Sequence, residues 1–400
     1  MIIKKTKNVF FIILCFVLDN YAEAQPQYHA NKTLVNYVYL GELSKVVARQ
    51  VLQKTPPLDT LAINYDASLY KITYKTPAPD GQLTIASGLV IAPIISIGTT
   101  GIVSYQHGTR FNRDDVPSKR VSKNYTNAAV FANHGGYFTV MPDYLGLGDN
   151  ALTPHPYMHD ETLANSSVDM LWAAKELAAL LNYPLNEQLY LTGYSEGGFS
   201  TLVMFELLST QYKELPITGV ALGSAPYDWE ETINFIVNNP GPHASAYLAY
   251  FFYALQTYRQ YWPDLGQIFI APYDTMIPAL FDGYHSEQEI VNALPYNPVH
   301  IFQPQFIKAI LKQTERHAEQ LKHDFNHYYF SPTAPLLIVS SKGDRELPYH
   351  GAEIAYQQFS KRGQDVFLKS VSDEMDHSAA GPYVLLEQVK FFQKLRPHRP

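Results

Sequence analysis

Apolar and polar side chains first alternate regularly along residues 69–76 (LYKITYKT), and residues 82–93 (QLTIASGLVIAP) then form a mostly apolar run. Between the two lies Pro79-Asp80-Gly81, a combination that favours a turn. Alternation at a period of two is typical of a strand with one buried face. The pattern therefore predicts an antiparallel pair of strands, with which we expect the sheet to begin.

Beyond residue 100, short apolar segments alternate with longer segments of helical periodicity. The predicted strands are residues 100–106, 137–142, 187–192, 217–222, 335–340 and 366–371. The predicted helices are residues 160–181, 349–361 and 382–395, and the first of them returns Ala164, Val168, Leu171, Ala174, Ala178 and Leu181 to one face. Strands that alternate with helices predict an α/β fold, in which crossover helices connect a mostly parallel sheet.

This alternation stops between residues 229 and 331, a segment rich in aromatic side chains. We interpret the segment as a cap inserted into the α/β core, whose two parts are then residues 25–228 and 332–400. Most of its aromatic side chains, such as those from Tyr247 to Tyr253, are expected to pack the cap's own core. Because a cap contributes walls to the site that it covers, a few should line an apolar pocket.

The composition supports a globular chain and excludes one class of partner. Of the 400 residues, 46% are hydrophobic and 17% are charged, which suits a protein with a substantial core. The 30 basic and 37 acidic residues give a formal net charge of −7, and the sequence has no cluster of Lys or Arg that could neutralise a phosphate backbone. Nucleic acid is therefore not an expected partner.

The first 24 residues have the pattern of a signal peptide. Three lysines among the first seven residues precede a short apolar run at residues 9–18, and small residues follow at Ala22 and Ala24. The run is too short for a membrane span, which needs about 20 residues to cross ~30 Å of hydrocarbon. We expect cleavage near Ala24 and a secreted or periplasmic protein.

The one cysteine, Cys15, lies inside this predicted signal peptide. Attachment of a lipid to Cys15 is disfavoured, because Leu14 before it is larger than such processing sites normally accept. The mature chain therefore has no thiol for a disulfide, for catalysis or for zinc.

The strongest chemical signal is Gly193-Tyr194-Ser195-Glu196-Gly197-Gly198, which lies directly after one predicted strand and before a helix that starts near Gly198. A nucleophile on such a tight strand-to-helix turn needs small neighbours, and Gly193 and Gly197 provide that clearance. The alternative is a glycine-rich turn that contains a serine by chance, but it leaves the placement between strand and helix unexplained. We predict that Ser195 is the nucleophile.

A serine nucleophile requires a histidine that takes its proton and a carboxylate that orients the histidine. Asp344 follows the next-to-last predicted strand, and His377 follows the last one and precedes the final predicted helix. We therefore predict Asp344 as the acid and His377, in the last loop, as the base. Glu346 and Asp228 remain alternative acids, whereas Asp376, beside His377, is expected to point elsewhere.

The oxyanion of an acyl-transfer reaction needs two N–H donors. The loop after the strand at residues 100–106 contains Gly108, which permits close approach, so Thr109 N–H and Glu196 N–H are the predicted donors. The sequence His134-Gly135-Gly136 competes for this role, but it precedes its strand and is better explained as a helix stop. The Glu196 carboxylate should be paired or solvated, because an unpaired negative charge would repel the oxyanion.

His155 and His159 are four residues apart, a spacing that suits a metal site on a helix. Pro154 and Pro156 disfavour a regular helix there, so no metal is expected, and the sequence suggests no cofactor.

These segments together resemble the secretory lipase family within the α/β hydrolases. The resemblance spans roughly residues 80–395 and rests on Tyr105–Thr109, Gly136–Gly148, His155-Pro156-Tyr157, Gly193–Gly198, the Asp344 loop and Asp376-His377. It implies the α/β-hydrolase fold and an exported enzyme that hydrolyses carboxylic esters or lipids, with an insertion over the site. The family's nucleophile, acid and base then correspond to Ser195, Asp344 and His377. One departure is that fungal members generally hold disulfides, which this mature chain lacks.

The expected function is cleavage of carboxylic esters, as an esterase or lipase, through an acyl-enzyme on Ser195. A serine peptidase of the same fold is the alternative, and a non-catalytic binding protein on a hydrolase scaffold is a third hypothesis. The expected partners are a small-molecule or lipid ester and, transiently, a lipid surface.

Overall fold

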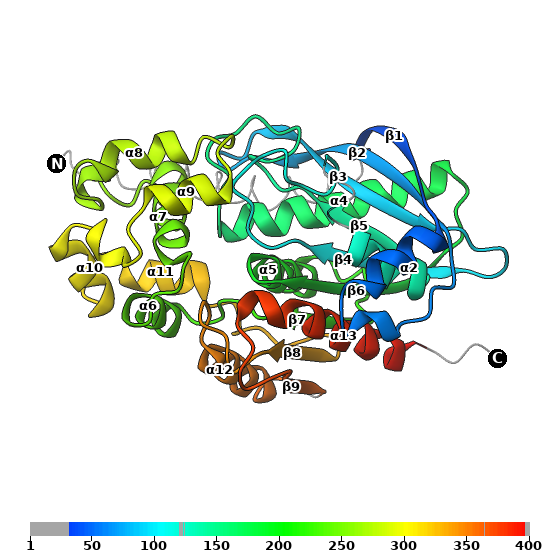
Figure 1. The fold of residues 1–400 in the computed structure, drawn as a ribbon. Coiled ribbons are helices and arrows are strands. Elements are labelled where there is room, and N and C mark those ends of the chain that lie inside the picture. Colours follow the sequence, from blue (N-terminus) through cyan, green and yellow to red (C-terminus); the bar gives the residue numbers. More distant parts are fainter. Residues whose placement is uncertain (1–31, 120–122, 124, 364, 397–400) are drawn as a thin grey trace, which may run out of the picture.

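The computed structural model describes residues 32–119, 123, 125–363 and 365–396, so the predicted signal peptide with Cys15 lies outside the described residues. Within the described residues nine strands form one sheet, in the order β1-β2-β3-β5-β4-β6-β7-β8-β9 (Figure 1). The strands are β1 (Leu34–Leu43), β2 (Ala67–Pro77), β3 (Leu83–Pro93), β4 (Thr100–Gln106), β5 (Phe138–Pro142), β6 (Leu185–Tyr194), β7 (Gly219–Gly223), β8 (Leu336–Ser340) and β9 (Val366–Ser370).

Most of the sheet is parallel, as the alternation of strands and helices predicted. From β5 through β4, β6, β7 and β8 to β9, every pair of neighbours is parallel, whereas β1, β2 and β3 pair antiparallel and β3 is antiparallel to β5. The predicted pair of strands is confirmed as β2 and β3, which are in register from Ala67 opposite Pro93 to Pro77 opposite Leu83.

The expectation that the sheet begins with β2 was wrong, because β1 precedes it at the edge of the sheet. The residues of β1 are mostly exposed, and its sequence LVNYVYLGEL has consecutive apolar residues instead of regular alternation. An edge strand without a buried face leaves little periodic signal, so the sequence pattern missed it.

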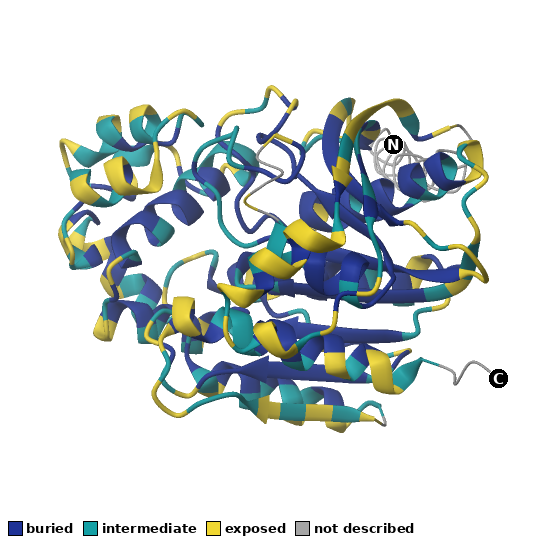
Figure 2. Ribbon diagram, turned by 45° about the vertical axis from the view of Figure 1, so that its right-hand side comes forward, coloured by how far each residue is buried: buried dark blue, intermediate teal, exposed yellow. Residues whose placement is uncertain are grey.

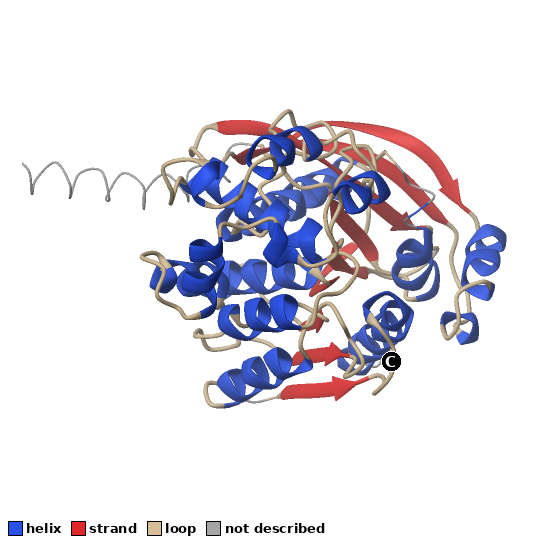
Figure 3. Ribbon diagram, turned by 60° about the vertical axis from the view of Figure 1, so that its left-hand side comes forward, coloured by secondary structure: helices blue, strands red, loops and turns tan. Residues whose placement is uncertain are grey.

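The described helices cover both faces of the sheet and also form a separate group (Figure 3). They are α2 (Lys45–Gln53), α3 (Tyr125–Ala128), α4 (Asp160–Leu180), α5 (Glu196–Gln211), α6 (Trp229–Asn238), α7 (Ala244–Arg259), α8 (Tyr273–Leu280), α9 (Glu287–Ala293), α10 (Pro304–Leu311), α11 (Ala318–Phe325), α12 (Tyr349–Ser360) and α13 (His377–Leu395).

Successive residues of the central strands face two different hydrophobic cores. In β6, Leu189 and Leu191 pack in the core beneath α4, α5 and α12, whereas Tyr190 between them packs in the core beneath α2 and α13. The strands are therefore buried on both faces, as Figure 2 shows for the middle of the sheet. This explains why they appear in the sequence as short apolar runs, as expected for parallel strands covered on both sides.

Residues 229–331, which we call the helical insertion, lie between β7 and β8 and contain α6 to α11. In Figure 1 these helices gather at one end of the molecule, on the left. Its aromatic residues build a core of their own, with Phe252 in contact with the rings of Trp262, Phe302 and Phe306. None of the helices described by the structure combines the length and the apolar character that a membrane span requires.

Leu191→Ala is expected to lower the free energy of unfolding by about 2–5 kcal/mol, because Leu191 is fully buried in the middle of the sheet and its loss leaves a cavity. Leu180→Ala removes the same atoms from a side chain that is 63% exposed, and it should cost less than about 0.5 kcal/mol. Urea unfolding of both variants measures the difference. Similar losses in the two variants would contradict the assignment of this core.

Candidate active site

Ser195 lies at the junction between β6 and α5, since β6 ends at Tyr194 and α5 begins at Glu196. Its φ of 60° is in the left-handed region, which is strained for a residue other than glycine. Two backbone hydrogen bonds hold this conformation: Ser195 N donates to Gly223 O (2.9 Å), and Ser195 O accepts from Gly198 N (2.8 Å). The Ser195 hydroxyl makes no capping bond to α5, although serine commonly caps helices.

Glycines allow the backbone to pass close to itself around Ser195. A Cβ on Gly193 would lie 2.1 Å from Gly197 O, and a Cβ on Gly197 would lie 2.0 Å from Gln106 O. Neither distance leaves room for a side chain, because non-bonded atoms would overlap. A Cβ on Gly108 would be 3.5 Å from Ser195 Cβ, so the loop after β4 passes directly beside the serine.

His377 and Asp344, the predicted base and acid, are hydrogen-bonded to each other. His377 Nδ1 donates to Asp344 Oδ2 (2.7 Å), and both side chains are buried. The other carboxylate oxygen, Asp344 Oδ1, accepts from the backbone N–H groups of Glu346 (2.9 Å) and Leu347 (3.0 Å). The loop after β8 thus fixes the Asp344 carboxylate, which in turn orients the imidazole.

The prediction that His377 lies in a loop was wrong, because it is the first residue of α13. Asp376 caps this helix by accepting a hydrogen bond from Ala379 N (2.9 Å). The helix predicted over residues 382–395 therefore begins five residues earlier, and it continues through Pro382. A proline removes one backbone donor, and here the cap and the packing of α13 against the sheet outweigh that loss.

Neither alternative acid contacts the Nδ1 atom of His377. Asp228 caps α6 by accepting from Glu231 N (2.9 Å). Glu346 approaches the other nitrogen, with its Oε2 3.9 Å from His377 Nε2.

Two opposing effects act on the pKa of His377. Burial lowers it, whereas the hydrogen bond to Asp344 and the negative charges of Asp344 and Glu346 raise it, and the net result is a pKa above the ordinary histidine value. A base must be neutral to accept a proton, so the basicity of Nε2 should be lost as the pH falls through this raised pKa.

Ser195 and His377 are connected through Tyr194, although β7 and β8 lie between β6 and β9, the strands that precede the two residues. Tyr194, the residue before Ser195, donates a hydrogen bond to His377 O, and the two rings lie 5.0 Å apart. No hydrogen bond joins Ser195 Oγ to His377 Nε2 within the described part of the chain. Catalytic hydrogen bonds are often long in the absence of substrate.

The two predicted oxyanion donors, the N–H groups of Thr109 and Glu196, belong to segments that pass Ser195. Glu196 is the first residue of α5, so its N–H is at the helix end that lacks intrahelical acceptors. Thr109 directly follows Gly108, and its Oγ1 lies 3.1 Å from Tyr157 OH. In contrast, His134 ends a helical turn (Ala129–His134), and Gly135 and Gly136 lie between this turn and β5. Gly136 has the positive φ of 67° that is typical of a helix end.

The Glu196 side chain is paired, as its position beside the nucleophile suggested. Its Oε1 lies 2.8 Å from His155 Nε2, and both side chains are only 1% exposed. His155 Nδ1 donates to Leu145 O (2.5 Å), and Tyr144 stacks on the ring. This role of His155 has no local signal in the sequence, where His155 contributes to the family resemblance and to a spacing that suits a metal site.

His159 makes a separate contact, because its Nδ1 accepts from Thr162 N (3.4 Å) at the start of α4. Across the residues that the structure describes, no group of three His, Cys, Asp or Glu side chains is arranged to hold a metal ion.

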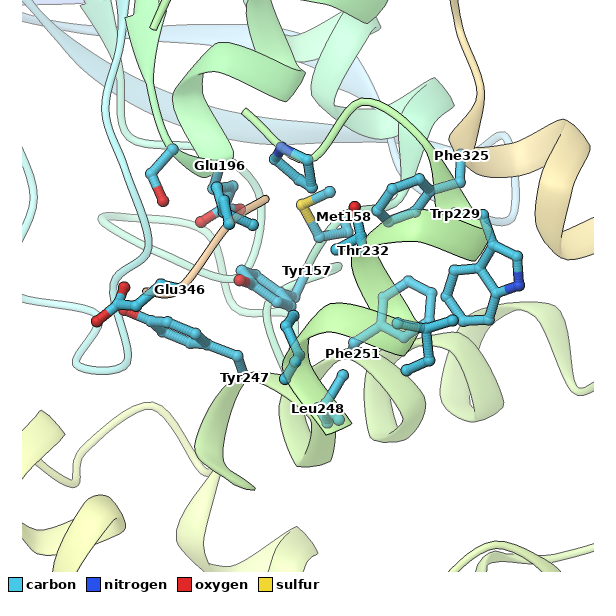
Figure 4. A pocket seen from close by; sticks show the side chains of 15 residues that line it. Tyr157, Met158, Glu196, Trp229, Thr232, Tyr247, Leu248, Phe251, Phe325 and Glu346 are labelled. Atoms are coloured by element: carbon cyan, nitrogen blue, oxygen red, sulfur yellow. The ribbon is translucent and has the colours of Figure 1, made fainter. Parts of the chain in front are cut away.

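An apolar cavity opens at Ser195. Its lining includes Ser195, Glu196, Trp229, Ile233, Leu248, Phe251, Phe325 and Glu346. Figure 4 shows the two carboxylates, Glu196 and Glu346, at one side of the cavity and the aromatic side chains of Trp229, Phe251 and Phe325 at the other. Seven of the fifteen lining residues belong to α6 and α7 of the helical insertion. The cavity can therefore hold an apolar group whose polar end lies near Ser195.

Comparison with known proteins identifies a family to which this chain is similar. A family model described as secretory lipase matches residues 128–380 of this chain. Among solved structures, a protein from Legionella pneumophila that is named provisionally as a hydrolase has 59% sequence identity and a TM-score of 0.91, and the match covers 92% of this chain and 100% of that one. No curated protein sequence matches this chain.

Two further solved structures show the fold at lower identity. The rice cell wall degrading esterase LipA from Xanthomonas oryzae is 23% identical, with a TM-score of 0.82 over 91% of this chain and 99% of its own. Candida antarctica lipase A is 17% identical, with a TM-score of 0.67 over 91% of this chain and 81% of its own. With the sheet described above, these likenesses confirm the predicted α/β-hydrolase fold.

Replacing His155 by Ala is expected to lower the free energy of unfolding by about 3 kcal/mol, because the buried Glu196 carboxylate would lose its hydrogen-bond donor. Adding Glu196→Gln should recover part of the loss, since a neutral amide costs less to bury. Urea unfolding of the single and double variants measures both effects.

The exposed pair His350–Glu353, whose atoms lie 2.9 Å apart, provides the matched control. His350→Ala should change the free energy of unfolding by less than about 0.5 kcal/mol, because solvent screens exposed pairs. If His155→Ala cost no more than this control, the Glu196–His155 pair would not be a buried structural contact.

Proposed function

This chain belongs to the secretory lipase family of hydrolases, and on that premise we propose that it cleaves carboxylic esters with Ser195 as the nucleophile. The observation that carries the proposal is the strained turn at Ser195, which opens into an apolar cavity and lies beside the hydrogen-bonded pair of His377 and Asp344. A serine, a base and an orienting acid in this relation are the groups that acyl transfer requires.

In the proposed reaction, His377 Nε2 takes the proton of the Ser195 hydroxyl while Oγ bonds to the ester carbonyl carbon. The carbonyl oxygen becomes an oxyanion, which accepts hydrogen bonds from Thr109 N–H and Glu196 N–H. The C–O bond to the alcohol then breaks, the alcohol leaves with the proton from His377, and the acyl group stays on Ser195. Water attacks this acyl-enzyme by the same proton transfers, which release the acid and restore the serine hydroxyl.

The substrate proposed for this site has an apolar acyl group. One part of the cavity beside Ser195 is lined by aromatic and aliphatic side chains of α6 and α7, which would exclude water from an acyl chain. On this basis the helical insertion acts as the cap of the site. Deleting the helical insertion would expose the cavity to solvent.

Export and transient contact with a lipid surface belong to the same proposal. Export is supported by the family's description as secretory and by the lysine-rich start and short apolar run of the first 24 residues. An apolar acyl substrate would bring the enzyme to lipid surfaces.

Ser195→Ala is expected to lower kcat/KM for p-nitrophenyl esters by about 10⁴-fold or more, because no other group replaces the covalent step. Peptide anilides tested alongside should be cleaved more slowly than esters by the wild type. Ester hydrolysis that survives in the variant would refute the mechanism, and faster cleavage of anilides would favour the peptidase alternative.

Ile233→Trp should distinguish long from short acyl chains, because Ile233 lines the cavity and a larger side chain would fill part of it. We expect at least a tenfold loss of kcat/KM for p-nitrophenyl octanoate or longer esters. Hydrolysis of the acetate ester serves as the internal control and should change much less. An equal loss for all chain lengths would indicate that the acyl group does not bind in this cavity.

A further inference from the structure

The Glu346 side chain lies between two histidines. Its Oε1 is 2.7 Å from His243 Nδ1, and its Oε2 is 3.9 Å from His377 Nε2. The side chain is only 10% exposed. Glu346 also lines both the cavity at Ser195 and a second cavity that His243 and His377 border. It therefore lies against the ring nitrogen of His377 that Asp344 leaves free.

His243 belongs to the helical insertion and is held between two carboxylates. It directly precedes α7, and its Nε2 lies 2.9 Å from Glu287 Oε1 in α9. Since both ring nitrogens face carboxylate oxygens, both must carry a proton and the ring is a cation. Hydrogen bonds to Glu287 and Glu346 accordingly raise the pKa of His243 to about 10.

We propose that Glu346 is a positioning residue for His377, and that His243 moderates its effect by neutralising part of its charge. The inference rests on the proposed function, because it takes His377 as the base. At 3.9 Å the Glu346 carboxylate is too far from Nε2 for a hydrogen bond, so Nε2 remains available to the Ser195 hydroxyl. The same carboxylate is close enough to stabilise the imidazolium that forms when Nε2 takes the proton.

The proton itself does not pass through Glu346. It moves from Ser195 Oγ to His377 Nε2 and from there to the departing alcohol, while Glu346 stays a carboxylate throughout. Its role is electrostatic: it favours the charged form of His377, and the His243 cation opposes this. His243 belongs to the helical insertion, so the position of the insertion relative to the α/β core influences the basicity of His377.

The groups that face His377 come from three parts of the fold. Asp344 and Glu346 come from the loop after β8, Tyr194 from the end of β6 and His243 from the insertion. Burial lowers the pKa of His377, Asp344 and Glu346 raise it, and His243 lowers it. Removing Glu346 and removing His243 should therefore shift the pKa of His377 in opposite directions.

The experiment compares Glu346→Gln, which keeps the shape of the side chain, with His243→Gln. The acidic limb of the kcat/KM profile for a p-nitrophenyl ester should move to lower pH in Glu346→Gln and to higher pH in His243→Gln. The double variant should return towards the wild-type profile. A merely structural role would lower activity without opposite shifts of the two profiles.

A second measurement does not depend on activity. In the Ser195→Ala protein, NMR titration of labelled histidines, with His377 assigned by its loss in His377→Gln, should show the same opposite shifts. Glu353→Gln is the matched control, since Glu353 pairs with the exposed His350, and it should leave the titration of His377 unchanged.

Two kinds of failure are distinguishable. If the two variants shift His377 in the same direction, or not at all, Glu346 does not act on the base and the inference is wrong. If the NMR shifts appear but Ser195→Ala retains ester hydrolysis, the proposed function fails while the electrostatic arrangement stands. Thermal unfolding of each variant identifies any loss that arises from misfolding.

Discussion

The close contact between the start of α5 and the end of β4 is the constraint on which the rest of the site depends. Gly197 lies so near Gln106 O that no side chain fits, and this contact holds the helix directly over the sheet. Ser195 is thereby fixed in a strained conformation with its hydroxyl free of the helix. The loop after β4 is brought beside it at the same time, because Gly108 is also in contact. One backbone contact thus places the nucleophile and the candidate oxyanion donors together.

Three carboxylate–imidazole pairs lie around the turn at Ser195, and each has a different role. They are Asp344–His377 (2.7 Å), Glu196–His155 (2.8 Å) and Glu346–His243 (2.7 Å). The first orients the candidate base, and the second gives the buried carboxylate beside Ser195 a donor. The third connects the helical insertion to the loop after β8. Charges in a site of low dielectric interact strongly, so pairing them keeps an apolar cavity compatible with charged groups.

The arrangement of the parallel strands explains why residues far apart in the sequence meet. β6, β7 and β8 are neighbours, and their carboxyl ends share one edge of the sheet. Ser195 follows β6 and Asp344 follows β8, so both lie at that edge. His377 reaches it from the start of α13, which packs across β7 and β8. This is the place where ligands bind in open α/β sheets.

The sequence by itself determined the parallel strands and predicted the three residues of the candidate triad. Buried strands need apolar runs, and a tight turn at Ser195 needs the glycines around it, so both are visible locally. Only the tertiary structure decided the edge strand β1, the helical position of His377 and the partners of Glu196 and Glu346. These depend on exposure, on capping and on contacts across the fold, and pairs such as His155–Glu196, 41 positions apart, leave no local pattern because the chain brings them together only when folded.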